Sequence, residues 1–297
     1  MTITTTTADG RIEIAADGAP IATYEEGADI APFESPKPYL HPVRTRAGEV
    51  VTDMRPADHV WHKGLQFALT DVAGRNFWGG NTYVPGRGYE ALDVVGRVRR
   101  DEVATSSAEG DARIREQLSW VSPEGSVLLT EQREQRIHAP ADGLWAIDLR
   151  TSVRNVSGRE LELGSPTTKG RPDAGYTGWI LRLAPSFHHG SVIGQTASGA
   201  WLDGEEEVRG APAHWALFAS RTGSAAVLAL AGRSTGPRLK WFARSEEYPA
   251  LGPSTHWDEP QFLGPRASLD VSHRFVVLDE TPPRDEAAAL AERLRVE

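Results

Sequence analysis

The residues best suited to chemistry lie close together in one short stretch, 53–68. Asp58, His59, Trp61, His62 and Lys63 occupy positions there between a Pro-Ala-Asp turn and a glycine. Apolar and polar residues alternate from position 65 onward. This order predicts a loop that brings polar side chains to one place and then enters a strand. His59 and His62 would converge on one small ligand or ion. A polar turn whose histidines cap backbone groups fits the stretch equally well.

The two histidines and Asp58 also offer nitrogen and oxygen ligands to a metal ion. His256 or Glu259 would complete a set that zinc, manganese or iron would accept. A His-x-x-His spacing on a loop is not a specific signature, however, so we expect no resident cofactor. If a divalent metal is bound, His59 and His62 are its expected ligands.

A second polar segment, 171–179, is a glycine-punctuated loop that leads into a strand. Arg171, Asp173 and Tyr176 are its candidates for substrate binding. An Asp–Arg pair that only holds a turn is the alternative, because such surface pairs are common and weak.

A third polar segment follows the strand 239–243. Trp241 lies in this strand and Arg244 comes directly after it. We expect a long loop over 245–262, and long loops in compact domains are often functional. Its candidate side chains are Glu246, Glu247, His256, Asp258 and Glu259.

Tryptophan is frequent, with nine residues, many of them beside turns. Flat aromatic faces next to polar groups suit sugar rings, which have apolar C–H faces and polar hydroxyls. Trp61 and Trp241 are therefore expected to bind substrate, together with His256. Most of the other tryptophans are expected in the core.

Composition excludes several classes of function. The chain has 297 residues, a formal net charge of −9 and no cysteine. The acidic balance argues against nucleic acid as a partner, and the lack of cysteine excludes disulfides and thiolate chemistry. No apolar run approaches the roughly 20 residues of a membrane span, and the N-terminus lacks the pattern of a secretion signal. We expect a cytoplasmic protein with a small-molecule ligand and no membrane partner.

The patterning predicts one all-β domain over 1–297. Residues 147–154 alternate strictly, while 126–138 is polar on both faces in its second half. That second pattern indicates either a wet cleft on one face or a charged edge strand. One helix is expected over 282–296, and residues 1–10 are expected to be frayed.

Three motifs resemble the bacterial PmoA-like family, catalogued as "methane oxygenase PmoA". They are the segments 38–45, 58–65 and 76–79, and the resemblance runs from about residue 38 to 280. It implies an antiparallel β-supersandwich of the galactose-mutarotase type and a role in carbohydrate catabolism. The family's third histidine is replaced here by Trp61, which weakens a three-histidine metal site.

These observations support three hypotheses of function. In the first, an enzyme acts on a sugar or keto-glycoside by acid/base chemistry of the lyase, hydratase or isomerase type, in a concave β-sheet cleft. His59 and His62 would move protons, while Lys63, Arg171 and Arg244 would hold hydroxyls or developing negative charge. The second is a non-catalytic carbohydrate-binding protein, and the third a metal-dependent oxygenase-like protein.

One geometric expectation follows from the first hypothesis. His59, His62, Arg171 and Arg244 should line the main concave pocket together, since each lies where a loop meets a strand. The sequence fixes neither the oligomeric state, nor the sugar, nor the bond acted on.

Overall fold

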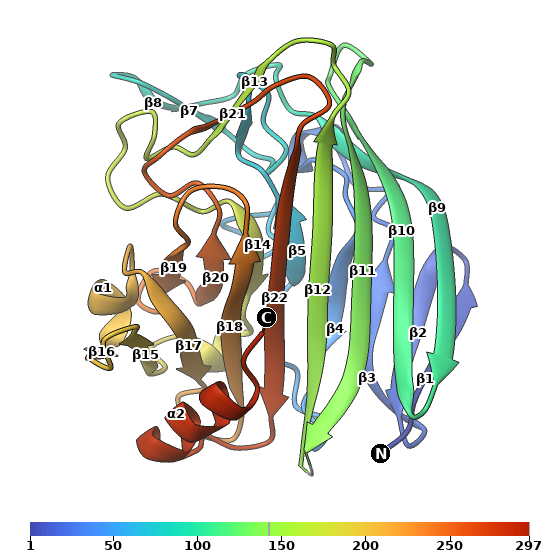
Figure 1. Cartoon of the computed structure of the whole chain (residues 1–297), viewed down its shortest axis with the longest axis vertical. Coiled ribbons are helices and arrows are strands. Elements are labelled where there is room, and N and C mark those ends of the chain that lie inside the picture. The colour runs from blue at the N-terminus through green and yellow to red at the C-terminus, as the bar shows by residue number, and fades with distance from the viewer. Residues whose placement is uncertain (142, 297) are drawn as a thin grey trace.

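Two antiparallel sheets stacked face to face dominate the structure (Figure 1). The computed structural model describes residues 1–141 and 143–296. The eight-stranded sheet runs in the order β1 (Ile3–Ala8), β2 (Arg11–Ala16), β3 (Ala19–Glu25), β4 (Tyr39–Val43), β5 (Leu65–Ala68), β14 (Gly178–Arg182), β20 (Ala250–Ser254) and β19 (Lys240–Arg244). The nine-stranded sheet runs in the order β16 (Trp201–Asp203), β15 (Val192–Thr196), β17 (Ala213–Ala219), β18 (Ala226–Ser234), β22 (Ser268–Leu278), β12 (Leu144–Asn155), β11 (Val127–Ala141), β10 (Asp111–Val121) and β9 (Arg97–Ala108).

Two smaller sheets lie at the upper end of the sandwich in Figure 1. One contains β21 (Gln261–Leu263), β13 (Leu161–Gly164) and β6 (Asp71–Val72), and the other is the hairpin β7 (Thr82–Val84) and β8 (Gly88–Glu90). Strands make up 52% and helices 7% of the structure, so the expected all-β sandwich is confirmed.

The main core lies between the two large sheets. Trp120, Trp145, Trp179 and Trp241 meet there, each at most 1% exposed. Large apolar side chains contribute roughly 1.5–3 kcal/mol each when fully buried. Because successive residues of a strand point to opposite faces, the neighbours of these tryptophans face outward.

The strand that is polar on both faces, β11, lies between β10 and β12, so it is not an edge strand. Its inward-facing Arg133 donates from Nε to Oε1 of Glu131 at 2.7 Å and from Nη1 to the Tyr24 hydroxyl at 3.0 Å. Trp120 also donates to Glu131 at 2.9 Å. These contacts satisfy charges inside the core, as burial requires. The other face of β11 is open to solvent.

Helices are few. The helix expected over 282–296 is α2 (Arg284–Arg293), which follows Pro282 and Pro283 and, within the described residues, has no side-chain cap at its N-terminus. It buries Ala287, Leu290 and Ala291 against the outer face of the nine-stranded sheet, as its place over β18 and β22 shows (Figure 1). The other helical segments are α1 (Gly204–Val208) and two 3-10 turns, η1 (Pro32–Glu34) and η2 (Pro185–Phe187).

Three sequence-based expectations about elements are wrong. Residues 3–8 form a strand rather than a frayed end, because Ile3 pairs with Ala16 and is 1% exposed. The segment 245–262 is not one loop, since β20 and most of β21 lie within it or at its end. The long strands β9 and β10 were not anticipated, because their exposed polar residues mask the alternation.

Among the described residues, no helix combines the length and the apolar character that crossing a membrane requires.

Candidate functional site

Two arginines project from the outer face of the eight-stranded sheet. Arg182 ends β14 and Arg244 ends β19, and in the sheet register both lie opposite Ala250 of the intervening strand β20. Their neighbours on the alternate face, Trp179 and Trp241, point into the core. The two guanidinium groups therefore face outward about two strand spacings apart, roughly 10 Å.

The loop 53–64 folds over this face. The backbone N–H of His59 donates to the carbonyl of Pro56 at 3.0 Å, and that of His62 donates to His59 at 2.9 Å. These two turns bring the imidazole rings of His59 and His62 into a stack, with centroids 4.6 Å apart. Tyr248, just before β20, packs against His59 at 4.9 Å and His62 at 5.3 Å. We call His59, His62, Arg182, Arg244 and Tyr248 the histidine–arginine cluster.

Asp58 orients His59. Nδ1 of His59 lies 2.6 Å from Oδ2 of Asp58. Burial raises the pKa of Asp58, but hydrogen bonds from His59 and the backbone, together with the charges of His59 and Arg182, leave the pKa below its usual value. An ionised carboxylate only accepts, so Nδ1 carries the proton and Nε2 keeps a lone pair. Within residues 1–141 and 143–296, His59 Nε2 has no hydrogen-bond partner, so it is left for a ligand.

His62 is held neutral. It is 4% exposed, and burial, followed by the charges of His59 and Arg182, lowers its pKa well below the usual value. Nη1 of Arg182 approaches Nδ1 of His62 at 3.4 Å. Because a guanidinium only donates, Nδ1 is the acceptor and Nε2 carries the proton. His62 is thus a neutral hydrogen-bond donor at neutral pH.

Arg182 has more donors than partners. It is 7% exposed, its Nε has no partner in the described chain, and its nearest carboxylate, Asp53, is 3.9 Å away. Burial lowers its pKa. Nε of Arg244 is also buried without a partner among those residues, although Arg244 pairs with the exposed Glu247. Unused donors of buried arginines are costly, which marks this face as a place for ligand oxygens.

Aromatic rings surround the cluster. Both arginines stack on the ring of Tyr248, with Cζ 4.7 Å away for Arg182 and 5.4 Å for Arg244. Trp78 packs edge-on against His62 at 5.5 Å and lies 5.1 Å from Tyr176. Trp61, Tyr176 and Tyr248 are half-buried, so they form a rim above a buried floor.

The expected residues of the loop 171–179 lie at the margin of the cluster. Arg171 stacks on Tyr89 at 4.7 Å, and the hydroxyls of Tyr89 and Tyr176 are 2.6 Å apart. Arg171 is thus connected to the cluster through two tyrosines, without touching the histidines. Asp173 is exposed on a turn with φ of 53°.

Three other expected site residues are corrected by the structure. Lys63 is fully buried, and its ammonium donates to the carbonyls of Glu34 at 2.8 Å and Trp61 at 3.1 Å. Burial lowers the pKa of Lys63 to about 7. Trp241 faces the core and donates to the carbonyl of Ala213 at 2.9 Å. His256 is 0% exposed and contacts Thr255 and Gln261.

The expectation about the main concave pocket is also wrong. Two cavities of about 710 Å³ occur among the described residues, one on the outer face of the nine-stranded sheet and one beside residues 8–13 and 25–31, and neither is lined by His59, His62, Arg171 or Arg244. His59, His62 and Arg244 do come together, but on the outer face of the eight-stranded sheet.

No group of three or more His, Cys, Asp or Glu side chains arranged to hold a metal occurs in the described part of the chain. His256 does not join His59 and His62, because both of its ring nitrogens contact other side chains. The structure therefore does not place His256 where it could complete a metal site with His59 and His62.

Sequence reasoning missed Arg182 and Tyr248. Arg182 ends a run, Trp179-Ile180-Leu181, that is typical of a buried strand. A charged residue at the end of such an apolar run is the sequence signal that could have pointed to Arg182. Tyr248 gave no signal, because its role depends on its place between two strands that are far apart in sequence from the histidine loop.

Fold and cluster together define an all-β, two-sheet protein with an aromatic-walled, arginine-rich site on one outer face. A family model matches residues 11–292, and its description is Family of unknown function (DUF6807). The chain belongs to this family. The name of the PmoA-like family has no support from this match. No curated protein matches the chain.

Two kinds of solved structure resemble the chain remotely. The Slr1438 protein from Synechocystis sp. PCC 6803 shares 10% identity at a TM-score of 0.41, covering 94% of this chain and 96% of that one. Two structures of a Glycoside Hydrolase Family 97 enzyme from Pseudoalteromonas sp. strain K8, one in complex with panose, share 7% identity at a TM-score of 0.39. They match 94% of this chain but 34% of theirs, so this chain spans about a third of that enzyme's length. Likenesses this remote assign no function.

Proposed function

We propose that the histidine–arginine cluster is an acid/base site that acts on a carbohydrate, with a keto sugar or keto-glycoside as the substrate. One observation carries the proposal. A histidine oriented by Asp58 lies against a neutral histidine and a buried guanidinium whose Nε has no partner among the described residues. A base next to unused donors suits removal of a proton from a carbon beside a carbonyl.

Each residue has a chemical role in this proposal. Nε2 of His59 takes the proton from carbon, and the electron pair of the C–H bond moves onto the carbonyl oxygen. The resulting enolate oxygen accepts hydrogen bonds from Arg182 and from Nε2–H of His62. His59 then returns the proton to a neighbouring atom, which isomerises the sugar. Alternatively, the enolate re-forms the carbonyl and a C=C bond as a group on the next carbon leaves with its bonding pair and takes the proton from His59.

The rim supports a sugar as the ligand. Trp61, Tyr176 and Tyr248 are half-buried aromatic residues beside the polar groups of the cluster. Apolar C–H faces of a sugar suit such rings, while its hydroxyls need donors and acceptors. The small-molecule carbohydrate ligand and a cytoplasmic location both belong to this proposal. The oligomeric state is no part of it.

The competing proposal is a non-catalytic carbohydrate-binding site, which the aromatic rim alone would favour. Titration calorimetry and turnover with keto-glycosides and their parent glycosides separate the two. We expect His59→Gln to keep binding within a few-fold and to lose about 10²–10⁴ in turnover. Binding by the wild type without any turnover across the panel would favour the binding protein.

A metal-dependent oxygenase-like protein is the third proposal. It requires a bound metal with open positions. Metal analysis of protein purified without chelator, together with turnover after chelation, tests it. Full activity of metal-free protein would exclude it.

A further inference from the structure

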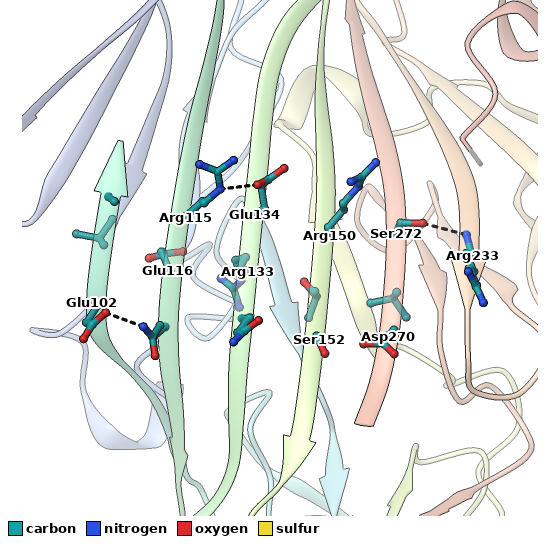
Figure 2. A pocket seen from close by; sticks show the side chains of 16 residues that line it. Glu102, Arg115, Glu116, Arg133, Glu134, Arg150, Ser152, Arg233, Asp270 and Ser272 are labelled. Atoms are coloured by element: carbon teal, nitrogen blue, oxygen red, sulfur yellow. Dashed lines mark hydrogen bonds and ion pairs between the residues drawn. The ribbon is translucent and has the colours of Figure 1, made fainter. Parts of the chain in front are cut away.

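The outer face of the nine-stranded sheet carries a second polar surface. Side chains of β9, β10, β11, β12, β22 and β18 line its cavity of about 710 Å³ (Figure 2). That volume is within the usual range for ligand sites, roughly 300–1,000 Å³. Along β10, β11 and β12, buried residues alternate with outward-facing ones. The sheet register therefore arranges the outward side chains in rows across the strands.

One row crosses four neighbouring strands: Arg115, Glu134, Arg150 and Ser272 are consecutive partners. Glu134 is already engaged, because Arg115 donates to it at 2.6 Å and Arg113 at 2.9 Å. Arg150 lies on the other side of Glu134 (Figure 2) and has no hydrogen bond or ion pair within residues 1–141 and 143–296. Its five donors are left for a ligand.

A second row supplies uncharged and acidic partners. Gln117, Gln132, Ser152 and Asp270 follow one another across the same strands. Gln117 donates to Glu102 at 2.6 Å. The side chains of Gln132, Ser152 and Asp270 have no partner in the part of the chain that the structure describes. Amide, hydroxyl and carboxylate groups of this kind suit the hydroxyls of a sugar.

Arg233 of β18 closes the cavity at one end. Its backbone N–H donates to the Ser272 hydroxyl at 3.1 Å, while its side chain makes no ion pair among the described residues. Arg150 and Ser272 also line an adjoining cavity of about 200 Å³. Arg150 is thus at the junction of the two hollows, with Arg233 across β22 from it (Figure 2).

The larger cavity holds arginines that form no ion pair among the described residues, although the chain as a whole is acidic. The chain carries −9 in total. Glu116 and Arg133 also line the larger cavity, but they pair inside the core with Arg100 and Glu131. The remaining charged residues of the larger cavity balance, with Arg115, Arg150 and Arg233 against Glu102, Glu134 and Asp270, but within residues 1–141 and 143–296 neither Arg150 nor Arg233 forms an ion pair. Two guanidinium groups in one cavity, without ion pairs in the part of the chain that the structure describes, favour an anionic ligand.

We infer that this surface binds an acidic oligosaccharide, with Arg150 and Arg233 holding a carboxylate and the Gln132, Ser152 and Asp270 row holding hydroxyls. The histidine–arginine cluster lies on the opposite outer face of the sandwich, beyond the core. The two sites are therefore separate, and this inference stands whether or not the cluster is catalytic.

Titration calorimetry with trigalacturonate at low salt tests the inference, with maltotriose as the neutral probe of equal length. We expect the wild type to bind trigalacturonate more tightly than maltotriose. Arg150→Gln should weaken that binding about tenfold or more, because charge-assisted hydrogen bonds are strong. Arg154→Gln is the matched control, since Arg154 is exposed on the same face of β12 but does not line the cavity. It should change the affinity less than about twofold.

The inference fails if the wild type does not bind trigalacturonate, or if Arg150→Gln binds it as the wild type does. Equal binding of inorganic sulfate and trigalacturonate would overturn the sugar assignment. Equal binding of maltotriose would overturn the anionic one. Unchanged thermal unfolding of both variants shows that the fold is kept. His59→Gln should bind trigalacturonate as the wild type does, which distinguishes failure here from failure of the catalytic proposal.

Discussion

At the scale of single residues, the cluster combines groups that stability alone would not select. Arg182 is buried and close to a neutral histidine, and no carboxylate of the described residues is hydrogen-bonded to it. Desolvating a guanidinium without full pairing costs free energy, so Arg182 is a liability for folding. Such a residue is most simply explained by a ligand that completes its hydrogen bonds.

This argument predicts an uncommon result for Arg182→Met. A methionine of similar length fills the space and removes the desolvated charge. We expect the free energy of unfolding to stay within about 1 kcal/mol of wild type, or to rise. Turnover should fall by about 10²-fold or more if Arg182 stabilises developing charge. A marked loss of stability with full activity would assign Arg182 a structural role.

The structure also changes what His62→Ala can show. From the sequence alone, His62 is expected to line a pocket, so replacing it with alanine would leave the fold intact. His62 instead packs against Trp78 and Tyr248 and is 4% exposed, so its truncation would leave a cavity. His59, which is half-buried at the rim, is the better position for separating stability from function.

At the scale of elements, the histidine loop is held by close packing beneath it. Gly80 has φ of 70°, and a Cβ there would meet the Trp61 ring at 2.4 Å. Glu34 anchors the loop through Arg55 at 2.7 Å, and Lys63 donates to the Glu34 carbonyl at 2.8 Å. Gly80 and Glu34 therefore hold in place the loop that carries Trp61 at the rim of the site.

Gly80→Ala tests that support. The new methyl group would displace Trp61, so we expect a loss of about 2–4 kcal/mol in the free energy of unfolding, together with weaker ligand binding. Gly86→Ala is the control, because Gly86 has a similar φ of 75° but nothing within 4 Å of a new Cβ. Chemical denaturation of both variants measures how much of the loss in unfolding free energy comes from packing against Trp61. Equal losses would mean that backbone strain alone matters and that Trp61 is not held by Gly80.

Some elements could be predicted from the sequence and others could not, for physical reasons. Residues 147–154 alternate clearly because β12 is buried on one face only. The polar inner face of β11 was ambiguous, since Arg133 and Glu131 satisfy each other inside the core. His59 and His62 could be found from their spacing. Arg182 could not be joined to them, because β14 meets the histidine loop only through the sheet order.

At the scale of the whole molecule, the sandwich buries histidines that must stay neutral. His273 is 0% exposed, and burial lowers its pKa to about 3. Burial also lowers the pKa of His256 to about 4, against a small opposing effect of Gln261. As the pH falls, both imidazoles are therefore protonated at a higher pH in the unfolded chain than in the folded one.

This linkage sets the direction of the pH dependence. Because the folded pKa values lie below the unfolded value of about 6.5, the unfolded state binds more protons between about pH 6.5 and 4. Stability should therefore fall as the pH drops through that range, by up to about 1.4 kcal/mol per pH unit for each histidine. His273→Leu should flatten the curve of unfolding free energy against pH. An unchanged slope would contradict the buried, neutral state of His273.

The two outer faces of the sandwich have different chemistry. The eight-stranded sheet carries buried arginines and histidines under aromatic rings, and the nine-stranded sheet carries rows of exposed arginines and polar groups. The two proposals assign proton transfer to one face and binding of an acidic oligosaccharide to the other.

The central claim is that His59 removes a proton from a carbon next to a carbonyl. Deuterium incorporation at that carbon, followed by NMR in D₂O with a keto-glycoside, measures this step directly. We expect the wild type to catalyse exchange and His59→Gln to be slower by about 10²–10⁴-fold, with its thermal unfolding unchanged. Exchange at equal rates in both proteins, or no exchange by the wild type with any keto-glycoside that it binds, would contradict the account.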